Sequence, residues 1–443
     1  MTDKKHSGMM MFFIGLGGAT KVYLGGVIAL TELVVFAVAP MLLFKYYQEY
    51  KRNGMLVALW LSLAMIPGCF IACLVNNVPW IFFIKSSMQF YSIFAMIVVF
   101  YFVLRKSLYG IGWFYVGFFI STIVSIFILN PQVLMNESSV AWIGQMDVEE
   151  QMEGVLFWYP KITQILRLPV QGWYFSMPIV YSVVAPIIAG MIAIFISVSG
   201  RGAAAMGLLS SLLILYCRRS RRRIGSLGRN FIFFVLVGIC AAIGIKSLYS
   251  YAASTGLLGE KAQYKYYMQT HGDSSFLGIL IGGRTEFFIA IRAMIDNPIV
   301  GIGPAAEDKK GYVREFLIKY GDQEDFDAYI RHLKLWPDKI EVIPQHSTLT
   351  QFWGNAGILG LVFCSYFLYL LYMFFRRYAA VIPQWFGYFA IAIPPSIFSL
   401  FFNPYTERAT LPLLITCLLL SKAVGQGKLR LPYEMEMEAI KYE

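Results

Sequence analysis

The sequence predicts an all-α, polytopic membrane protein with roughly 10–12 transmembrane helices. Of its 443 residues, 58% are hydrophobic and only 14% are charged, whereas about a quarter of a soluble domain is charged. Apolar runs long enough to cross a bilayer recur along the whole chain. Aromatic residues reach 16%, which suits a bundle with many side chains at the membrane interfaces.

Each apolar run of about 20 residues predicts one membrane-spanning helix. The clear candidates are 55–75, 80–104, 108–129, 174–199, 230–250, 350–375 and 384–402, and the shorter ones are 9–20, 31–44, 202–217 and 409–421. Glu32 lies inside one of the shorter runs, and an acid within a membrane span is a candidate functional position.

The net charge of +11 arises largely from basic clusters that follow apolar runs. Cytoplasmic loops of membrane proteins collect Lys and Arg, so we expect the clusters at 218–223 and 376–377 and the tail from Lys422 to be cytoplasmic. The segment 251–349 then lies on the outer side of the membrane, which is the periplasm in a Gram-negative bacterium.

The expected division of the chain follows from this orientation. It consists of an N-terminal transmembrane bundle (1–250), a periplasmic loop domain with active-site elements (251–349), and C-terminal transmembrane helices with a cytoplasmic tail (350–443). Counting helices from a cytoplasmic Arg105-Lys106 gives a conflict, because a single span at 174–199 would place Arg201 inside. A short helical hairpin over 170–200 is one solution.

Residue patterns disfavour several classes of site. The six cysteines all lie in or beside apolar runs, which predicts neither a disulfide nor a zinc site. The sequence contains no P-loop and no convincing dinucleotide motif, and no aromatic-interleaved basic patch that would indicate nucleic acid. Asp325-Phe326-Asp327 matches a DxD metal pattern, but acidic pairs are common in polar loops and we interpret it as a solvated face. We therefore expect no metal and no cofactor.

The segment 276–360 stands out because it places Arg284, Arg292 and His346 beside a membrane. Such residues are costly there unless they line a watery cavity or bind an anion. The run GYVREFLIKYG spaces Tyr312, Phe316 and Tyr320 four residues apart, which predicts an amphipathic helix on the membrane or over a cavity.

Three arginines are weighed as anion-binding residues. Arg284 opens an amphipathic helix after Gly282-Gly283, which leave room for close approach, so a functional role is favoured for it. Arg292 follows about 80° around the same helix, but snorkelling to lipid headgroups is the slightly favoured interpretation there. Arg201 lies in a small-residue turn between two apolar helices, where its rigid fork would suit phosphate oxygens.

His346 precedes Ser347 and Thr348, either of which can cap the helix that follows. A lone histidine is usually an ordinary interface residue. Here two arginines are predicted on the same side of the membrane, and an imidazole that is neutral near pH 7 can accept a proton from a hydroxyl.

Three pieces of sequence, in this order, resemble the bacterial O-antigen polymerase and O-antigen ligase superfamily over about residues 195–375. The first is Ser199–Ala203 with the basic run after it. The second is Arg284 with its aromatic helix and the run from Asn297 to Gly303. The third is His346-Ser347 followed by Gly354, Gly357 and Gly360. The family often has Asn where this chain has Ser347.

The resemblance implies a metal-independent glycosyltransferase of the GT-C type. Its donor would be an oligosaccharide on undecaprenyl pyrophosphate. Arg201 and Arg284 would bind the pyrophosphate, His346 would activate the acceptor hydroxyl, and the anomeric carbon would invert. Arg292, Gly301, Gly303 and Ser347 are candidate supporting residues.

The leading interpretation is a polymerase of O-antigen or related repeat units in the bacterial inner membrane, with its active site facing the periplasm. An O-antigen ligase that transfers the glycan to lipid A-core uses the same motifs, as does a protein O-oligosaccharyltransferase. Expected partners are the lipid-linked glycan, membrane lipids and a candidate chain-length regulator. A lipid or polysaccharide transporter is the more distant alternative, which would show repeated halves with broken helices; we find no such internal repeat.

Overall fold

A computed structural model of the chain describes its two transmembrane ends and much of the segment between Thr285 and Tyr378. The described residues are 2–19, 21–23, 27–106, 110–124, 250–257, 263, 266, 285–320, 342–378, 386–403, 405 and 409–429. The predicted spans at 174–199 and 202–217, and nearly all of 230–250, lie outside these residues, as do Arg201, Arg284, Asp325 and Asp327.

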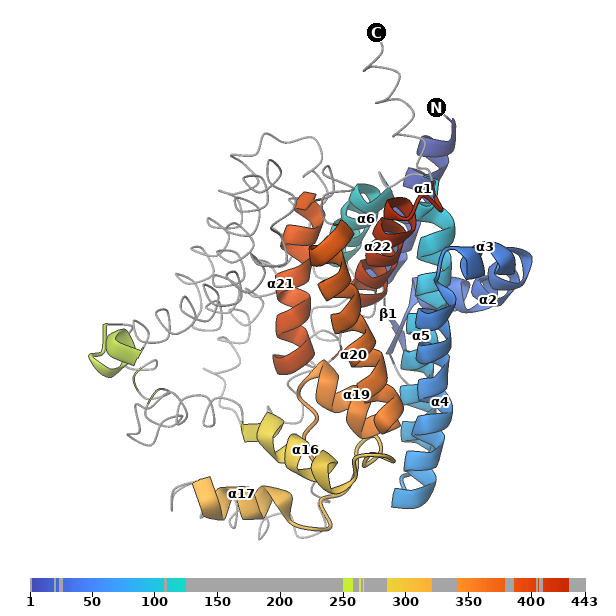
Figure 1. The fold of residues 1–443 in the computed structure, drawn as a ribbon. Helices are drawn as coiled ribbons and strands as arrows, with labels where there is room; N and C mark the ends of the chain where they lie inside the picture. The colour runs from blue at the N-terminus through green and yellow to red at the C-terminus, as the bar shows by residue number, and fades with distance from the viewer. Residues whose placement is uncertain are drawn as a thin grey trace.

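The described residues confirm the all-α membrane class (Figure 1). Helices long and apolar enough to cross a membrane are α4 (Leu56–Asn76), α5 (Trp80–Leu104) and the run Ile358–Tyr378, which comprises α20 (Ile358–Met373) and the π-turn η4 (Phe374–Tyr378). The other helices are α1 (Thr2–Ala19), α2 (Leu30–Lys45), α3 (Tyr47–Arg52), α6 (Gly110–Val124), α16 (Thr285–Asp296), α17 (Tyr312–Tyr320), α19 (Thr348–Ala356), α21 (Phe386–Phe402) and α22 (Thr410–Gly425).

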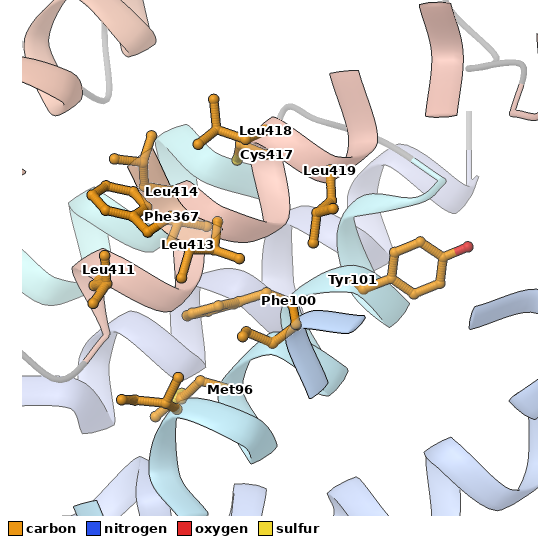
Figure 2. Close-up of a cluster of buried hydrophobic side chains, with 14 of the residues drawn as sticks. Met96, Phe100, Tyr101, Phe367, Leu411, Leu413, Leu414, Cys417, Leu418 and Leu419 are labelled. Atoms are coloured by element: carbon orange, nitrogen blue, oxygen red, sulfur yellow. The ribbon is translucent and has the colours of Figure 1, made fainter. Parts of the chain in front are cut away.

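Helix α5 forms the centre of the described bundle. Its sequence is apolar on nearly every side, which is typical of a helix surrounded by others, and α2, α4 and α22 all pack against it. Figure 2 shows the contact with α22, where Met96 and Phe100 of α5 lie among leucines of α22, with Phe367 of α20 in the same cluster. The N-terminal and C-terminal parts of the chain therefore share one core.

Helices α1 and α6 cross at a glycine contact. A Cβ atom added to Gly15 would overlap the carbonyl oxygen of Phe114, and one added to Gly117 would overlap that of Phe12. Small residues let two membrane helices approach this closely. The glycine-rich end of the first apolar run thus serves helix packing.

Basic residues gather at one end of the bundle, which we call the basic end. Helix α5 ends there at Arg105, which pairs with Glu49 and lies over the rings of Tyr46 and Phe102 at 4.3 and 4.6 Å. η4 and the end of α22 also meet, since Gln426 donates to the Tyr378 hydroxyl. The predicted clusters at Arg105-Lys106, Arg376-Arg377 and Lys422–Lys428 are consequently on one side, as their common orientation requires.

The opposite end carries α16, α17 and α19 (Figure 1), and we call it the His346 end. Helix α4 reaches it at Asn76, whose side-chain amide donates to the carbonyl oxygen of Gly301 at 3.2 Å. Helix α21 reaches it at Asn403, whose carbonyl accepts from the amide of Thr348 at 2.8 Å. Its charged residues are of both signs and partly paired, as in Lys309–Glu307.

The structure refines three details of the predicted helices. The predicted span 350–375 is broken at Gly357, so a short α19 precedes the membrane-crossing α20. Between the first two apolar runs, β1 (Lys21–Tyr23) and β2 (Val27–Ala29) pair as a small antiparallel sheet. Glu32 lies fully buried in the first turn of α2, and its carboxylate accepts from the Ala29 amide and from the Ser92 hydroxyl on α5, so it joins α2 to α5.

Candidate functional site

Two glycine-containing segments that are about fifty residues apart in sequence join at the His346 end. The amides of Ile302 and Gly303 both donate to the carbonyl oxygen of Gly354, each at 2.9 Å. The amide of Ile358 donates to the carbonyl oxygen of Ile299 at 2.8 Å. We call the joined segments, 297–303 and 353–358, the glycine clasp.

Glycine is required in the clasp for both space and backbone geometry. Gly301, Gly303 and Gly357 have φ of 81°, 85° and 59°, values that side chains with a Cβ rarely adopt. A Cβ on Gly357 would also overlap the Ile299 carbonyl, and one on Gly301 would overlap that of Gly354. The run Pro298–Gly303 therefore lies with its backbone directly against the end of α19.

The backbone on both sides of His346 is anchored. On the N-terminal side, the Gln345 side-chain amide donates to the carbonyl oxygen of Gly303 at 3.0 Å. On the C-terminal side, the amide of Thr348 donates to Asn403 at 2.8 Å. His346 itself is exposed, and its imidazole makes no hydrogen bond with the residues described. An accessible imidazole thus sits on a fixed backbone.

Ser347 is the N-cap of α19, which confirms that a residue next to His346 caps this helix. Its hydroxyl accepts from the amide of Thr350 at 3.0 Å, and the Thr350 hydroxyl accepts from the amide of Ser347 at 3.1 Å. Ser347 and Thr350 are fully buried. This reciprocal cap fixes the direction in which α19 leaves His346.

A closed ring of three hydrogen bonds holds α19 against α5 and the chain before α22. Gln351 accepts from the amide of Tyr405 at 2.9 Å and donates to Gln89 at 3.2 Å, and Gln89 donates to the carbonyl oxygen of Tyr405 at 3.0 Å. Within this largely buried contact, the oxygen and one N–H of each of the two side-chain carboxamides form hydrogen bonds. The ring joins three elements distant in sequence.

Helix α16 packs beneath α19 through buried residues. Ala290, Ala293 and Met294 are fully buried there, and Trp353 packs against the same cluster. The helix ends before Asn297-Pro298, as the sequence predicts. Arg284 immediately precedes the first residue of α16 in the sequence and, like Arg201, lies outside the described residues.

Arg292 projects from α16 into solvent rather than into the clasp. Its side chain is 55% exposed and pairs with Asp296 one turn later at 3.1 Å. Asp296 also accepts from the Tyr312 hydroxyl at 3.0 Å, which ties α17 to α16. Burial, followed by this bond to Asp296, raises the pKa of Tyr312 above its ordinary value. Through Asp296, Arg292 is therefore part of the contact between α16 and α17.

An exposed apolar strip extends from the glycine clasp onto the membrane-crossing α20. Ile295 and Ile299 are 55% and 70% exposed, and Ile358 and Val362 continue the strip at 41% and 40%. Since α20 is a candidate membrane span, the strip joins the lipid-facing surface of the bundle to the end that carries His346.

Sequence reasoning missed the polar residues that build this end. Asn76, Gln89, Gln345 and Gln351 all make hydrogen bonds between distant segments. Three of them have a signal in the sequence: an amide side chain in or at the edge of an apolar run is expensive in a membrane and usually bonds across helices. Which partner each one meets depends on tertiary structure.

Within the part of the chain that the structure describes, no group of three or more His, Cys, Asp or Glu side chains is arranged to hold a metal ion. Comparison with known families matches residues 185–365 to the family described as O-antigen ligase. The match begins before Arg201 and ends within α20, so it covers all three motif segments and the glycine clasp. No curated protein and no solved structure matches the chain.

Proposed function

We propose that this protein transfers a glycan from undecaprenyl pyrophosphate to an acceptor hydroxyl, because residues 185–365 match the family described as O-antigen ligase. The observation that carries the proposal is the presentation of His346, an exposed imidazole on a backbone anchored on both sides. A catalytic base must be held in one place yet remain accessible to its substrate.

The reaction divides between a base and a leaving group. The imidazole of His346 accepts the proton of the acceptor hydroxyl as its oxygen attacks the anomeric carbon. The bond from that carbon to the pyrophosphate oxygen breaks, and undecaprenyl pyrophosphate departs with the electron pair. Attack from the opposite face inverts the anomeric centre.

Arg201 and Arg284 are proposed to bind the pyrophosphate and to stabilise the charge that it gains. Both residues fall within the family match, and Arg284 directly precedes α16, which packs beneath α19. Fixed guanidinium groups suit this task because they stay charged and offer paired donors to phosphate oxygens. A diphosphate held this way needs no metal ion.

The orientation and the lipid nature of the donor have separate support. The basic end, with Arg105, Arg376 and Lys422, satisfies the positive-inside rule if it is cytoplasmic, and this supports our proposal that the His346 end faces the periplasm from the inner membrane of a Gram-negative bacterium. The apolar strip through Ile299 and Ile358 offers a path by which a polyprenyl tail in the bilayer reaches this end.

We propose polymerisation of O-antigen or related repeat units as the activity. Ligation to lipid A-core is the second candidate, and the description of the matched family favours it. The two activities share the donor and the motif residues, and they differ in the acceptor that His346 activates.

Purified protein in detergent, given only lipid-linked repeat units, tests the proposal. A polymerase produces a ladder of longer glycans, whereas a ligase produces a product only after lipid A-core is added. The absence of product with both acceptors, from protein shown to be folded, would refute the glycosyltransferase assignment.

The variant His346→Ala should reduce transfer to a low residual rate while leaving the unfolding temperature unchanged, since its side chain is exposed. His6→Ala is the matched control, because His6 is also exposed but lies far from the glycine clasp on α1. The next residue, Ser7, bonds to Val103, which places this part of α1 near the basic end. Transfer by His346→Ala at the rate of the control would remove this histidine from the mechanism.

A further inference from the structure

Gln345, the residue before His346, connects the two sides of the glycine clasp. Its Nε2 atom donates to the carbonyl oxygen of Gly303. The same nitrogen lies over the α-carbon of Gly354, where an added Cβ would come within 2.8 Å of it. The side chain is half-buried, so it is held by both segments while His346 next to it remains exposed.

These contacts close a circuit of bonds around His346. From Gln345 the circuit runs through Gly303 to Gly354, whose carbonyl accepts the Gly303 amide at 2.9 Å. It then follows α19 back to its N-cap, Ser347. If the Gln345 bond is removed, the circuit opens on the N-terminal side, where the next anchor is the bond from the Ile343 amide to the carbonyl oxygen of Ala306.

We infer that Gln345 is a positioning residue, which fixes the imidazole of His346 relative to the glycine clasp. The inference rests on the proposed function of His346 as the base. Gln345 does not touch the reacting atoms in this role. Its bond fixes the distance between Gly303 and the segment that carries the base. Because the run from Asn297 to Gly303 follows α16, the bond also fixes this segment relative to the end of α16.

The role predicts a specific kinetic effect. A base that is displaced by about 1 Å can lose about 100-fold in rate, whereas a donor lipid bound elsewhere is unaffected. Loss of the Gln345 bond should therefore lower kcat by about 10- to 100-fold while the KM for the lipid-linked donor stays within about twofold.

The test compares Gln345→Met, which keeps the length of the side chain but has no N–H donor, with the wild-type protein. Gln345→Asn is the second variant, because it keeps an amide that is one methylene too short to reach Gly303. Gln48→Met is the matched control, since Gln48 is exposed on α3 at the basic end. Only the Gln345 variants should lose kcat.

A double-mutant cycle separates positioning from a general structural role. If Gln345 acts through His346, Gln345→Met should change the residual activity of His346→Ala by less than about twofold. An equal loss of kcat in the wild-type and His346→Ala backgrounds would overturn the inference, as would unchanged kcat in both Gln345 variants.

A measurement without turnover distinguishes failure of the inference from failure of the proposed function. With ¹³C-labelled histidine, the ring signal of His346 is assigned by its loss in His346→Ala. It should shift or broaden in Gln345→Met and remain unchanged in Gln48→Met. If the wild-type protein proves inactive, a shifted signal still supports the placement of His346 by Gln345, and an unshifted signal refutes it.

Discussion

The amide of Gly303 donates a 2.9 Å hydrogen bond to the carbonyl oxygen of Gly354. This bond joins the run after Arg292 to the helix after His346, which the sequence presents as separate motifs. The glycines of both motifs are therefore explained first by contact with each other. His346, beside the clasp, remains exposed.

Substitution of the clasp glycines should have graded effects. Gly357→Ala introduces a Cβ at φ 59° and ψ −144°, a region that is nearly restricted to glycine, and against the Ile299 backbone. We expect strain of about 1–3 kcal/mol from the backbone conformation alone. At Gly354 the Cβ would meet only the ends of the Gln345 and Met294 side chains, which can shift. Gly357→Ala should thus lower the unfolding temperature in detergent more than Gly354→Ala does.

The same pair provides a functional contrast. Gly354→Ala should leave a folded protein with reduced kcat, because its Cβ displaces the Gln345 amide next to His346. Gly54→Ala is the control for backbone strain, since Gly54 has φ 73° with nothing near its added Cβ. Equal unfolding temperatures for Gly354→Ala and Gly357→Ala would contradict the geometry of the clasp.

The apolar runs predicted the membrane helices closely where the structure describes them. The prediction 80–104 coincides with α5, and 55–75 differs from α4 by one residue at each end. Length and hydropathy decide these boundaries locally, because lipid satisfies no backbone hydrogen bonds and the helix must do so itself. The break at Gly357 was not predicted, because the apolar run continues from α19 into α20 without a local signal that ends the helix. The turn there is required by the contact with the Ile299 backbone across the glycine clasp.

The candidate site was predictable in its parts but not in its connections. Ser347 is recognisable as an N-cap because capping is a local property. The bond from Gln345 to Gly303 spans 42 residues, and no spacing rule relates two such positions. Arg292 is the opposite case, because its contact is local. Its ion-pair partner, Asp296, lies one turn later on the same helix, so the sequence already contains the contact that places its side chain.

The ring formed by Gln89, Gln351 and the backbone of Tyr405 should behave as a unit. Gln351→Leu removes the acceptor of the Tyr405 amide and the donor to the Gln89 oxygen, at a cost of about 1–3 kcal/mol for each buried group. Gln89→Leu has an equivalent effect on the Tyr405 carbonyl and the Gln351 amide. Since the two changes share the bond between the glutamines, the double variant should lose less stability than the two single variants together.

Unfolding temperatures of the four proteins in the same detergent check this expectation. Gln426→Leu serves as the control, because Gln426 lies at the basic end, away from the ring, and its side chain donates a bond of 3.3 Å to the Tyr378 hydroxyl. If the stability losses of Gln89→Leu and Gln351→Leu were strictly additive, the three hydrogen bonds would not form a closed ring.

Tyr312 should make the contact between α16 and α17 sensitive to high pH. Burial and its bond to Asp296 raise the pKa of the phenol. The folded state therefore favours the neutral phenol. This contribution is fully present below the unfolded pKa of about 10 and is lost as the pH rises through the higher folded pKa. Limited proteolysis of the segment 297–311 should accelerate above pH 10 in the wild-type protein.

Tyr312→Phe removes both the titration and the bond to Asp296. Its proteolysis should be faster than that of the wild-type protein at neutral pH and should rise less between pH 9 and 11. Tyr251→Phe is the control, because Tyr251 is exposed outside this contact. The same rise in Tyr312→Phe as in the wild-type protein would assign the pH effect to another group.

Chelation distinguishes fixed cations from a metal ion as the groups that stabilise the leaving pyrophosphate. If Arg201 and Arg284 perform this role, EDTA should leave the transfer rate unchanged, because a guanidinium stays charged and needs no added ion. Arg284→Lys keeps the charge but loses the paired donors, so its kcat should fall and Mg²⁺ should not restore it. A transfer rate that falls with EDTA and returns with Mg²⁺ would contradict the arginine mechanism. It would direct attention to Asp325 and Asp327, whose alanine variants should then lose the metal response.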